Sequence, residues 1–209
     1  MEYGITEKLK EKSKLAYLRD AAEKNLLLCW EAGVVTKDGQ DVLLIVNAAT
    51  RYCTVLTGLE EVEWLDLRRT VEKGVKAAIR GAGIPDLFIN TYYENAGDAD
   101  VTVTHGEEAL EGFRYIAQTI ESSSAEESLE ELVKKLNGEL CTTAAFPAYE
   151  GFYPDDMFRG QMKSLLAGEE LILEYAKMKD GTLIRRGKLI LHPENEGAVI
   201  DMTSRGKLN

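Results

Sequence analysis

The sequence contains two histidines, and His105 lies in the context better suited to chemistry. Its surroundings, DVTVTHGEE, predict that a strand ends and a helix begins at this residue. Such junctions present free backbone N–H groups, and ligand binding or proton transfer is common there. The carboxylates nearest to it in sequence are Asp98, Asp100, Glu107 and Glu108. One hypothesis is therefore a metal-assisted hydrolase or another small enzyme centred on His105, and the alternative is a turn residue that bonds to local backbone.

Acidic residues are concentrated in the middle of the chain, which carries a formal net charge of -11. Residues 81–133 contain twelve acids and one base, Arg114, whereas acids and bases balance on either side. This concentration attracts basic partners and repels phosphate backbones. We therefore expect a non-catalytic binding protein whose acidic surface engages a basic protein and not nucleic acid. Solvated helix faces or a cation site are the alternatives. The residues expected at the partner are Asp98, Asp100, His105, Glu107, Glu108 and Glu111.

Several familiar catalytic patterns are missing from the sequence. The cysteines Cys29, Cys53 and Cys141 are far apart in apolar surroundings, which is typical of buried thiols more than of zinc ligands or nucleophiles. There is no HExxH motif, no phosphate-binding glycine loop and no G-x-S-x-G. We therefore expect no metal centre and no cofactor.

The periodicity of apolar residues predicts an α+β protein. The first half is expected to contain an antiparallel β-meander packed with several helices. Helical spacing is found at 6–24, 65–81, 85–95, 107–120 and 124–138, the last with a capping box of Ser124 and Glu127. Strand patterns are found at 25–36, 41–47, 51–57 and 100–104. A helix at 155–167 and a β-hairpin of 170–178 with 183–192 are expected to follow.

These elements predict a core domain over 1–145 and a C-terminal extension over 146–209 that packs on it. The first residues do not show the basic and then apolar pattern of a secretory signal, and no apolar run approaches the roughly 18 residues of a membrane span. A cytoplasmic protein without a membrane association is therefore expected.

Short motifs over the first two-thirds of the chain resemble a bacterial domain family of unknown function. They are Thr6 to Leu9, Trp30, DVLLIVNAATRYCTVLTG, the helix after Trp64, Gly83 to Pro85, and DVTVT. The resemblance implies a small α+β domain and no known activity. Where that family has a basic segment containing serine, this chain has Thr104 to Glu108, so no role of that segment is carried over.

Overall fold

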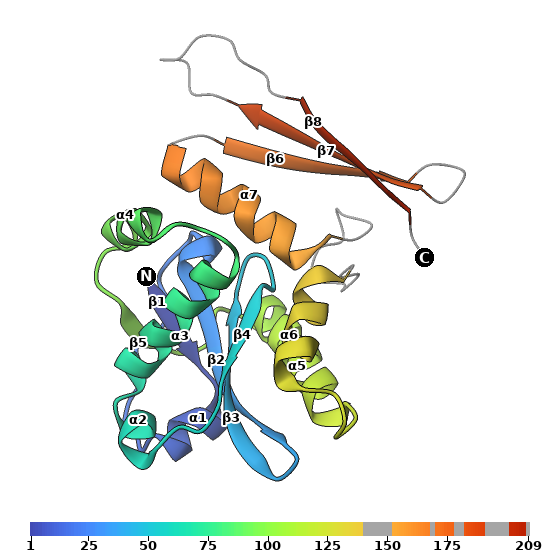
Figure 1. The fold of residues 1–209 in the computed structure, drawn as a ribbon. Coiled ribbons are helices and arrows are strands. Elements are labelled where there is room, and N and C mark those ends of the chain that lie inside the picture. Colours follow the sequence, from blue (N-terminus) through green and yellow to red (C-terminus); the bar gives the residue numbers. More distant parts are fainter. Residues whose placement is uncertain (140–151, 168–169, 178–181, 191–200, 208–209) are drawn as a thin grey trace.

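The computed structural model describes residues 1–139, 152–167, 170–177, 182–190 and 201–207. Within these residues the chain forms seven α-helices, one short 3-10 helix and two β-sheets (Figure 1). The α+β class expected from the sequence is confirmed.

The larger sheet has five strands in the order β4-β3-β2-β1-β5. Their bounds are β1 Glu2–Ile5, β2 Cys29–Lys37, β3 Gln40–Asn47, β4 Cys53–Leu56 and β5 Asp100–Thr102. Strands β2, β3 and β4 pair antiparallel, but β1 pairs parallel with both β2 and β5. The sheet is therefore mixed, and the expected antiparallel meander does not describe it. Periodicity misses β1 because only four residues form this strand, too few to establish alternation.

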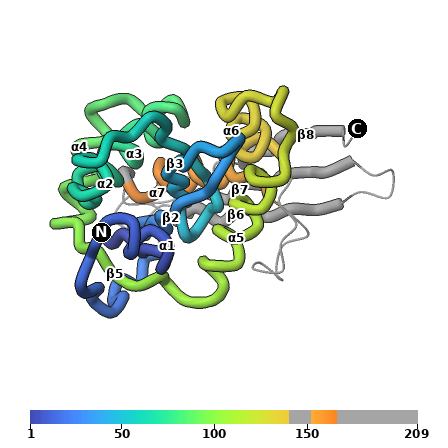
Figure 2. The backbone as a smooth tube through the Cα atoms, turned by 90° about the horizontal axis from the view of Figure 1, so that it is seen from below, coloured from blue at the N-terminus to red at the C-terminus, as the bar shows by residue number. Residues whose placement is uncertain are grey.

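Helices cover both faces of this sheet, and Figures 1 and 2 show them as two groups on either side of β2 and β3. On one face lie α3, α4 and α7, and on the other lie α5 and α6. The helix bounds are α1 Glu7–Lys12, α2 Glu61–Leu65, α3 Leu67–Gly81, α4 Asp86–Ala96, α5 Glu107–Ser122, α6 Leu129–Gly138 and α7 Pro154–Ala167, with a 3-10 turn at Leu26–Leu28.

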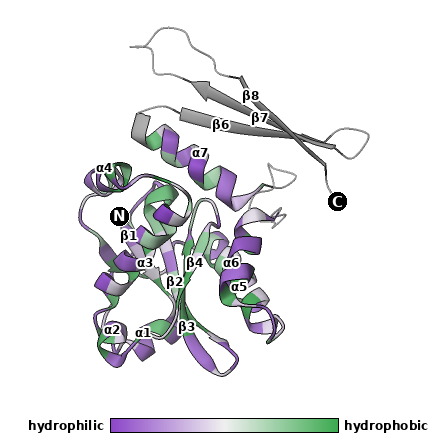
Figure 3. Cartoon of the chain, in the orientation of Figure 1, coloured by the Kyte–Doolittle hydropathy of each residue, from purple (hydrophilic) through white to green (hydrophobic). Residues whose placement is uncertain are grey.

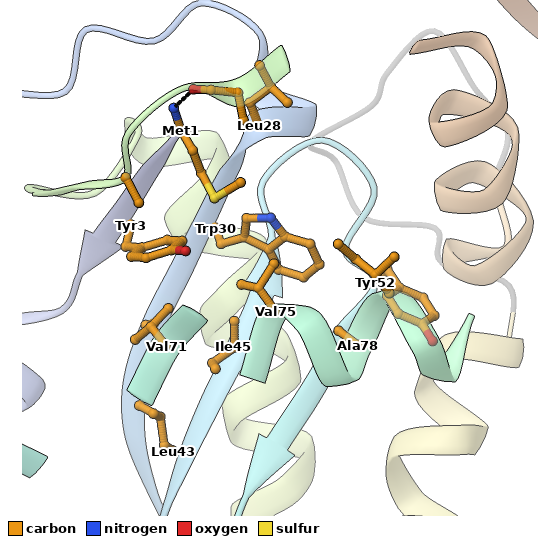
Figure 4. Packing of buried hydrophobic residues seen from close by; sticks show 14 of the residues in the cluster. Met1, Tyr3, Leu28, Trp30, Leu43, Ile45, Tyr52, Val71, Val75 and Ala78 are labelled. Atoms are coloured by element: carbon orange, nitrogen blue, oxygen red, sulfur yellow. Dashed lines mark hydrogen bonds between the residues drawn. The ribbon is translucent and has the colours of Figure 1, made fainter. Parts of the chain in front are cut away.

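Each face of the sheet has its own hydrophobic core. Under α3, the buried Trp30 packs among aliphatic side chains, and Figure 4 shows Val75 close to its ring. The ring of Phe158 from α7 stacks on Tyr52 at 4.7 Å and meets the edge of Trp30 at 5.6 Å, so α7 belongs to this core. Under α5 and α6 the core is aliphatic apart from Phe113 and Cys53. Figure 3 shows that green, hydrophobic segments concentrate on the central strands and on the helices against them.

The helix expected over 6–24 ends much earlier, at Lys12. The hydroxyl of Ser13 donates to the carbonyl of Leu9 at 2.7 Å, and Lys14 has a positive φ of 55°, which stops the helix. The following residues run past the sheet edge instead, where Arg19 forms a β-bridge with Thr102 of β5. The early stop therefore places this segment next to β1 and β5.

Two further expectations need correction. The capping box lies at Ser128 and Glu131, one helical turn after the predicted Ser124, because the second Ser-x-x-Glu directly precedes the apolar run of α6. The predicted C-terminal hairpin is part of a three-stranded antiparallel sheet. Its strands are β6 Glu170–Lys177, β7 Thr182–Ile190 and β8 Asp201–Lys207.

Some features lie beyond what the structure describes. The predicted domain boundary at 145/146 and Cys141 both fall outside the described residues. Among the helices that are described, none is long and apolar enough to cross a bilayer.

A buried arginine ties the β3–β4 turn to α5. The Arg51 guanidinium donates to the carbonyl of Ala48 and, at 2.8 Å, to the carbonyl of Glu108. It lies against Gly112, where a Cβ atom would overlap the guanidinium. The close approach of α5 to this turn therefore requires a glycine.

We expect Gly112→Ala to lower the free energy of unfolding by about 1 to 3 kcal/mol, because the buried guanidinium has fixed partners and cannot move aside. Urea unfolding followed by circular dichroism measures this loss. The matched control is Gly138→Ala, at a helical glycine whose Cβ position has no described atom within 4 Å. An equal loss in both variants would contradict the expected overlap.

Candidate functional site

The candidate site lies where the parallel strands β1 and β2 meet. Their register places Glu2 opposite Cys29 and Gly4 opposite Glu31. Alternate residues of a strand point to the same face, so these four positions share the face that α5 and α6 cover. Two carboxylates and a thiol are therefore brought to one end of a face that is otherwise apolar.

His105 reaches this face from the loop between β5 and α5. Its side chain is only 2% exposed and lies between two carboxylates. Nδ1 is 2.7 Å from Oε1 of Glu31, and Nε2 is 3.0 Å from Oε2 of Glu2. The backbone N–H of His105 also donates to Oε1 of Glu31, at 2.9 Å. Both ring nitrogens and the main chain are therefore fixed by the two glutamates. We call Glu2, Cys29, Glu31 and His105 the His105 cluster.

The segment that follows α1 completes the surroundings of Glu2. The backbone N–H of Ala22 donates to both carboxylate oxygens of Glu2, at 3.0 and 3.1 Å. The Glu2 side chain is 12% exposed, whereas the side chain of Glu31 is fully buried. Glu2 is therefore the carboxylate through which the cluster reaches the surface.

Gly4 makes room for the buried carboxylate of Glu31. A Cβ atom at this position would overlap Oε2 of Glu31 and lie 2.9 Å from its Oε1. Oε2 accepts no hydrogen bond from the residues that the structure describes, whereas Oε1 serves the ring and backbone of His105. The glycine thus sets where the carboxylate lies, and the carboxylate sets the orientation of the imidazole.

Cys29 adds a sulfur atom to the cluster. Its Sγ lies within 4.8 Å of a carboxylate oxygen of Glu2 and of a ring nitrogen of His105. Burial, and then the negative charges of Glu2, Glu23 and Glu31, raise the pKa of the thiol to about 12. Without a bound cation, Cys29 is therefore a neutral thiol at physiological pH.

The two carboxylates also determine the protonation of His105. Burial by itself disfavours the imidazolium, but hydrogen bonding and charge from Glu31, and then from Glu2, outweigh it. The pKa of His105 is therefore raised above its ordinary value of 6.5. In the charged form, the ring donates from Nδ1 to Glu31 and from Nε2 to Glu2.

A shallow hollow of about 430 Å³ opens next to the cluster on the side of Glu2. Its lining residues are Met1, Glu2, Ala22, Glu23, Lys24, Asp98 and Asp100. A larger hollow on the exposed side of α3 shares no residue with the His105 cluster. Because Glu2 lines the smaller hollow and contacts His105, that hollow adjoins the buried histidine.

The residues predicted to bind a partner lie in three different settings. Asp98 and Asp100 are exposed at the hollow, and Asp100 pairs with Arg19 at 3.1 Å. The His105 side chain is buried and does not share their surface. The remaining three acids are exposed on the first turns of α5, and one of them pairs with Arg114. They are Glu107, Glu108 and Glu111.

The acidic segment as a whole does not form one face. Helix α4 lies on one side of the sheet and helices α5 and α6 lie on the other (Figure 2). Basic residues from either flank also reach its acids. The pairs are Arg80 with Asp86, Arg19 with Asp100, and Lys135 with Glu127.

The sequence around His105 points to this residue but not to the partners of its ring. Glu2 and Glu31 are 103 and 74 residues away from it along the chain, whereas the acids near it in sequence do not contact its ring. One signal was available: Glu31 interrupts the strongly apolar run from Leu26 to Val35. A carboxylate inside a buried strand needs a partner, and that need points to a site.

Comparison with known sequences places this chain in a family. The chain belongs to the family described as Domain of unknown function (DUF6933), whose model matches residues 3–157. The expected resemblance to a domain family of unknown function is therefore confirmed, and the matched range includes Cys29, Glu31 and His105. No curated protein and no solved structure matches the chain.

The raised pKa of His105 predicts how stability depends on pH. A group whose pKa is raised by folding stabilises the native state below its unfolded pKa, and this contribution is lost as pH rises through the folded pKa. We therefore expect the stability difference between wild type and His105→Gln to be larger at pH 6 than at pH 9, by about 1.5 to 3 kcal/mol for the charged hydrogen bonds.

Urea unfolding of both proteins from pH 5.5 to 9 measures this difference. His192 is present in both chains, so its titration cancels in the comparison. A difference that stays constant across the range would show that the imidazole does not carry the expected charge.

Proposed function

We propose that this protein is a small hydrolytic enzyme whose reactive centre is the His105 cluster. The observation that carries the proposal is the position of His105, buried between two carboxylates that come from distant parts of the chain. The family description names no activity, so the proposal rests on the geometry.

The cost of this arrangement supports a functional role. Removing an ionisable group from water costs several kcal/mol, and replacing a buried ion pair with apolar side chains is often neutral or stabilising. Here Glu31 and His105 have side chains that are at most 2% exposed, on a face that otherwise packs apolar residues. A histidine whose pKa is raised by neighbouring carboxylates, close to an opening, is typical of an active site.

The hydrogen bonds give the two edges of the imidazole different roles. Glu31 holds Nδ1 and the backbone of His105, so it fixes the orientation of the ring. Nε2 is turned toward Glu2, which lines the hollow. A carboxylate that orients a histidine is a common part of hydrolytic centres. We infer that substrate enters through this hollow and reacts on the Glu2 side of His105.

A panel of chromogenic p-nitrophenyl carboxylic esters, phosphate monoesters and phosphate diesters tests the proposal. We expect wild type to hydrolyse at least one class, and Glu31→Gln to lower kcat by about 100-fold, because the amide cannot hold the ring as the carboxylate does. KM should change little, since Glu31 does not line the hollow.

The matched control is Glu130→Gln, which makes the same chemical change at an exposed position on α6. Its kcat should equal that of wild type. The proposal is wrong if no class is hydrolysed, or if Glu31→Gln is as active as the control.

A second candidate function is docking of a basic protein on the start of α5. Glu107, Glu108 and Glu111 are exposed there, and Tyr115 on the same helix is 52% exposed. Clustered carboxylates beside an exposed aromatic side chain suit a partner with Lys and Arg side chains. This candidate retains the expected acidic interaction, restricted to one helix end.

Charge reversal tests the second candidate. We expect Glu107→Lys combined with Glu108→Lys and Glu111→Lys to weaken salt-sensitive binding to immobilised protamine at least about 10-fold. The control reverses three exposed acids elsewhere, namely Glu94, Glu126 and Glu130, and gives the same net charge. Equal weakening in both triple variants would show that protamine binding depends on net charge alone, and docking at the start of α5 would then be wrong.

A further inference from the structure

We propose that Glu2, Cys29 and His105 bind a divalent transition-metal ion, and that zinc is the ion that their donor atoms fit best. Zinc would be the cofactor of the hydrolytic centre described above, so the site rests on that proposed function. The sequence predicted no metal centre because the three ligands are scattered along the chain, and only the sheet register and the β5–α5 loop bring them together.

The three donor atoms are already gathered around one point. An oxygen of Glu2, the sulfur of Cys29 and a nitrogen of His105 all lie within 4.8 Å of one another. In a tetrahedral zinc site, bonds of about 2.0 to 2.3 Å place neighbouring donors roughly 3.3 to 3.8 Å apart. Side-chain movements on the order of 1 Å would therefore close the site.

The donor set selects among cations. Mg²⁺ and Ca²⁺ prefer oxygen ligands, whereas a thiolate and an imidazole suit zinc and other transition metals. One carboxylate, one thiolate and one imidazole make three protein ligands, the number that catalytic zinc sites use. The fourth position then remains for water or substrate, and Glu2 links the site to the hollow.

Glu31 would act as a positioning residue in this site and not as a ligand. It accepts from Nδ1 of His105 at 2.7 Å, which leaves Nε2, on the Glu2 side, as the nitrogen that binds the metal. Metal-binding histidines commonly donate their other N–H to a carboxylate in this way. Gly4 fixes this carboxylate by the space it leaves. The carboxylate that would orient His105 as a metal ligand is therefore already in place in the folded chain.

Binding of the ion would displace two protons from the site. The ion takes the place of the proton that Nε2 shares with Glu2 and of the thiol proton of Cys29, and both protons leave to solvent. The bound ion then faces the charges of Glu2, Cys29 and, through the imidazole, Glu31. This arrangement replaces the cationic imidazolium with a cationic metal between the same carboxylates.

Cobalt titration of the full chain, first stripped with EDTA, tests the site. We expect one Co²⁺ per chain, with a thiolate-to-cobalt charge-transfer band and the visible bands of four-coordinate cobalt, both removed by added Zn²⁺. Cys29→Ser should lose the charge-transfer band. Glu31→Gln keeps all three ligands and should bind about 10- to 100-fold more weakly.

The control is Cys53→Ser combined with Cys141→Ser, which removes the other two cysteines and should keep the band. If Cys29→Ser fails to fold by circular dichroism, the affinity of Glu31→Gln decides, since its three ligands are intact. The site is refuted if wild type gives no band, if the band survives in Cys29→Ser, or if Glu31→Gln binds as tightly as wild type.

Activity is measured in the same samples with and without EDTA, so that the two proposals fail separately. If the cobalt spectrum forms but no substrate class is hydrolysed, the metal-site proposal stands and the hydrolase proposal is wrong. If hydrolysis persists in EDTA and no cobalt band forms, the hydrolase proposal stands and the metal-site proposal is wrong.

Discussion

The insertion of β1 between β2 and β5 is the constraint on which the rest of this structure depends. This four-residue strand pairs parallel with both neighbours and joins the hairpin strands β2 and β3 to the distant β5. It also contributes Tyr3 to one core and Glu2 to the His105 cluster. The same register therefore sets the packing of the domain and the positions of the ionisable groups.

Burying the ionisable groups of the His105 cluster lowers the stability of the fold, and their geometry is specific. Two carboxylates hold one imidazole at hydrogen-bond distance, Gly4 leaves space for one of them, and Ala22 binds the other. Apolar residues at these positions would cover the face at no electrostatic cost. The loss of stability is accompanied by an oriented imidazole, a neighbouring thiol and an adjacent hollow. Proton transfer and metal binding both use such an arrangement.

Charge at the surface is organised differently from what the sequence distribution suggests. The acids of residues 81–133 divide between helices on opposite faces of the sheet, and Arg19, Arg80 and Lys135 neutralise part of them. Linear charge density predicts a local field only when the segment folds onto one face. The start of α5 retains such a local concentration in Glu107, Glu108 and Glu111, which is why the docking proposal is restricted to that helix.

The sequence by itself determined the α+β class and the existence of most helices and strands, because these follow from periodicity, and residue chemistry singled out His105 as a candidate. Tertiary structure decided the rest. The end of α1 depends on Lys14, the pairing of β1 depends on strands from both sides, and the partners of His105 come from residues 2 and 31. Local patterns report only neighbours along the chain, whereas parallel pairing and a buried carboxylate–imidazole contact are formed between residues that only the folded chain brings together.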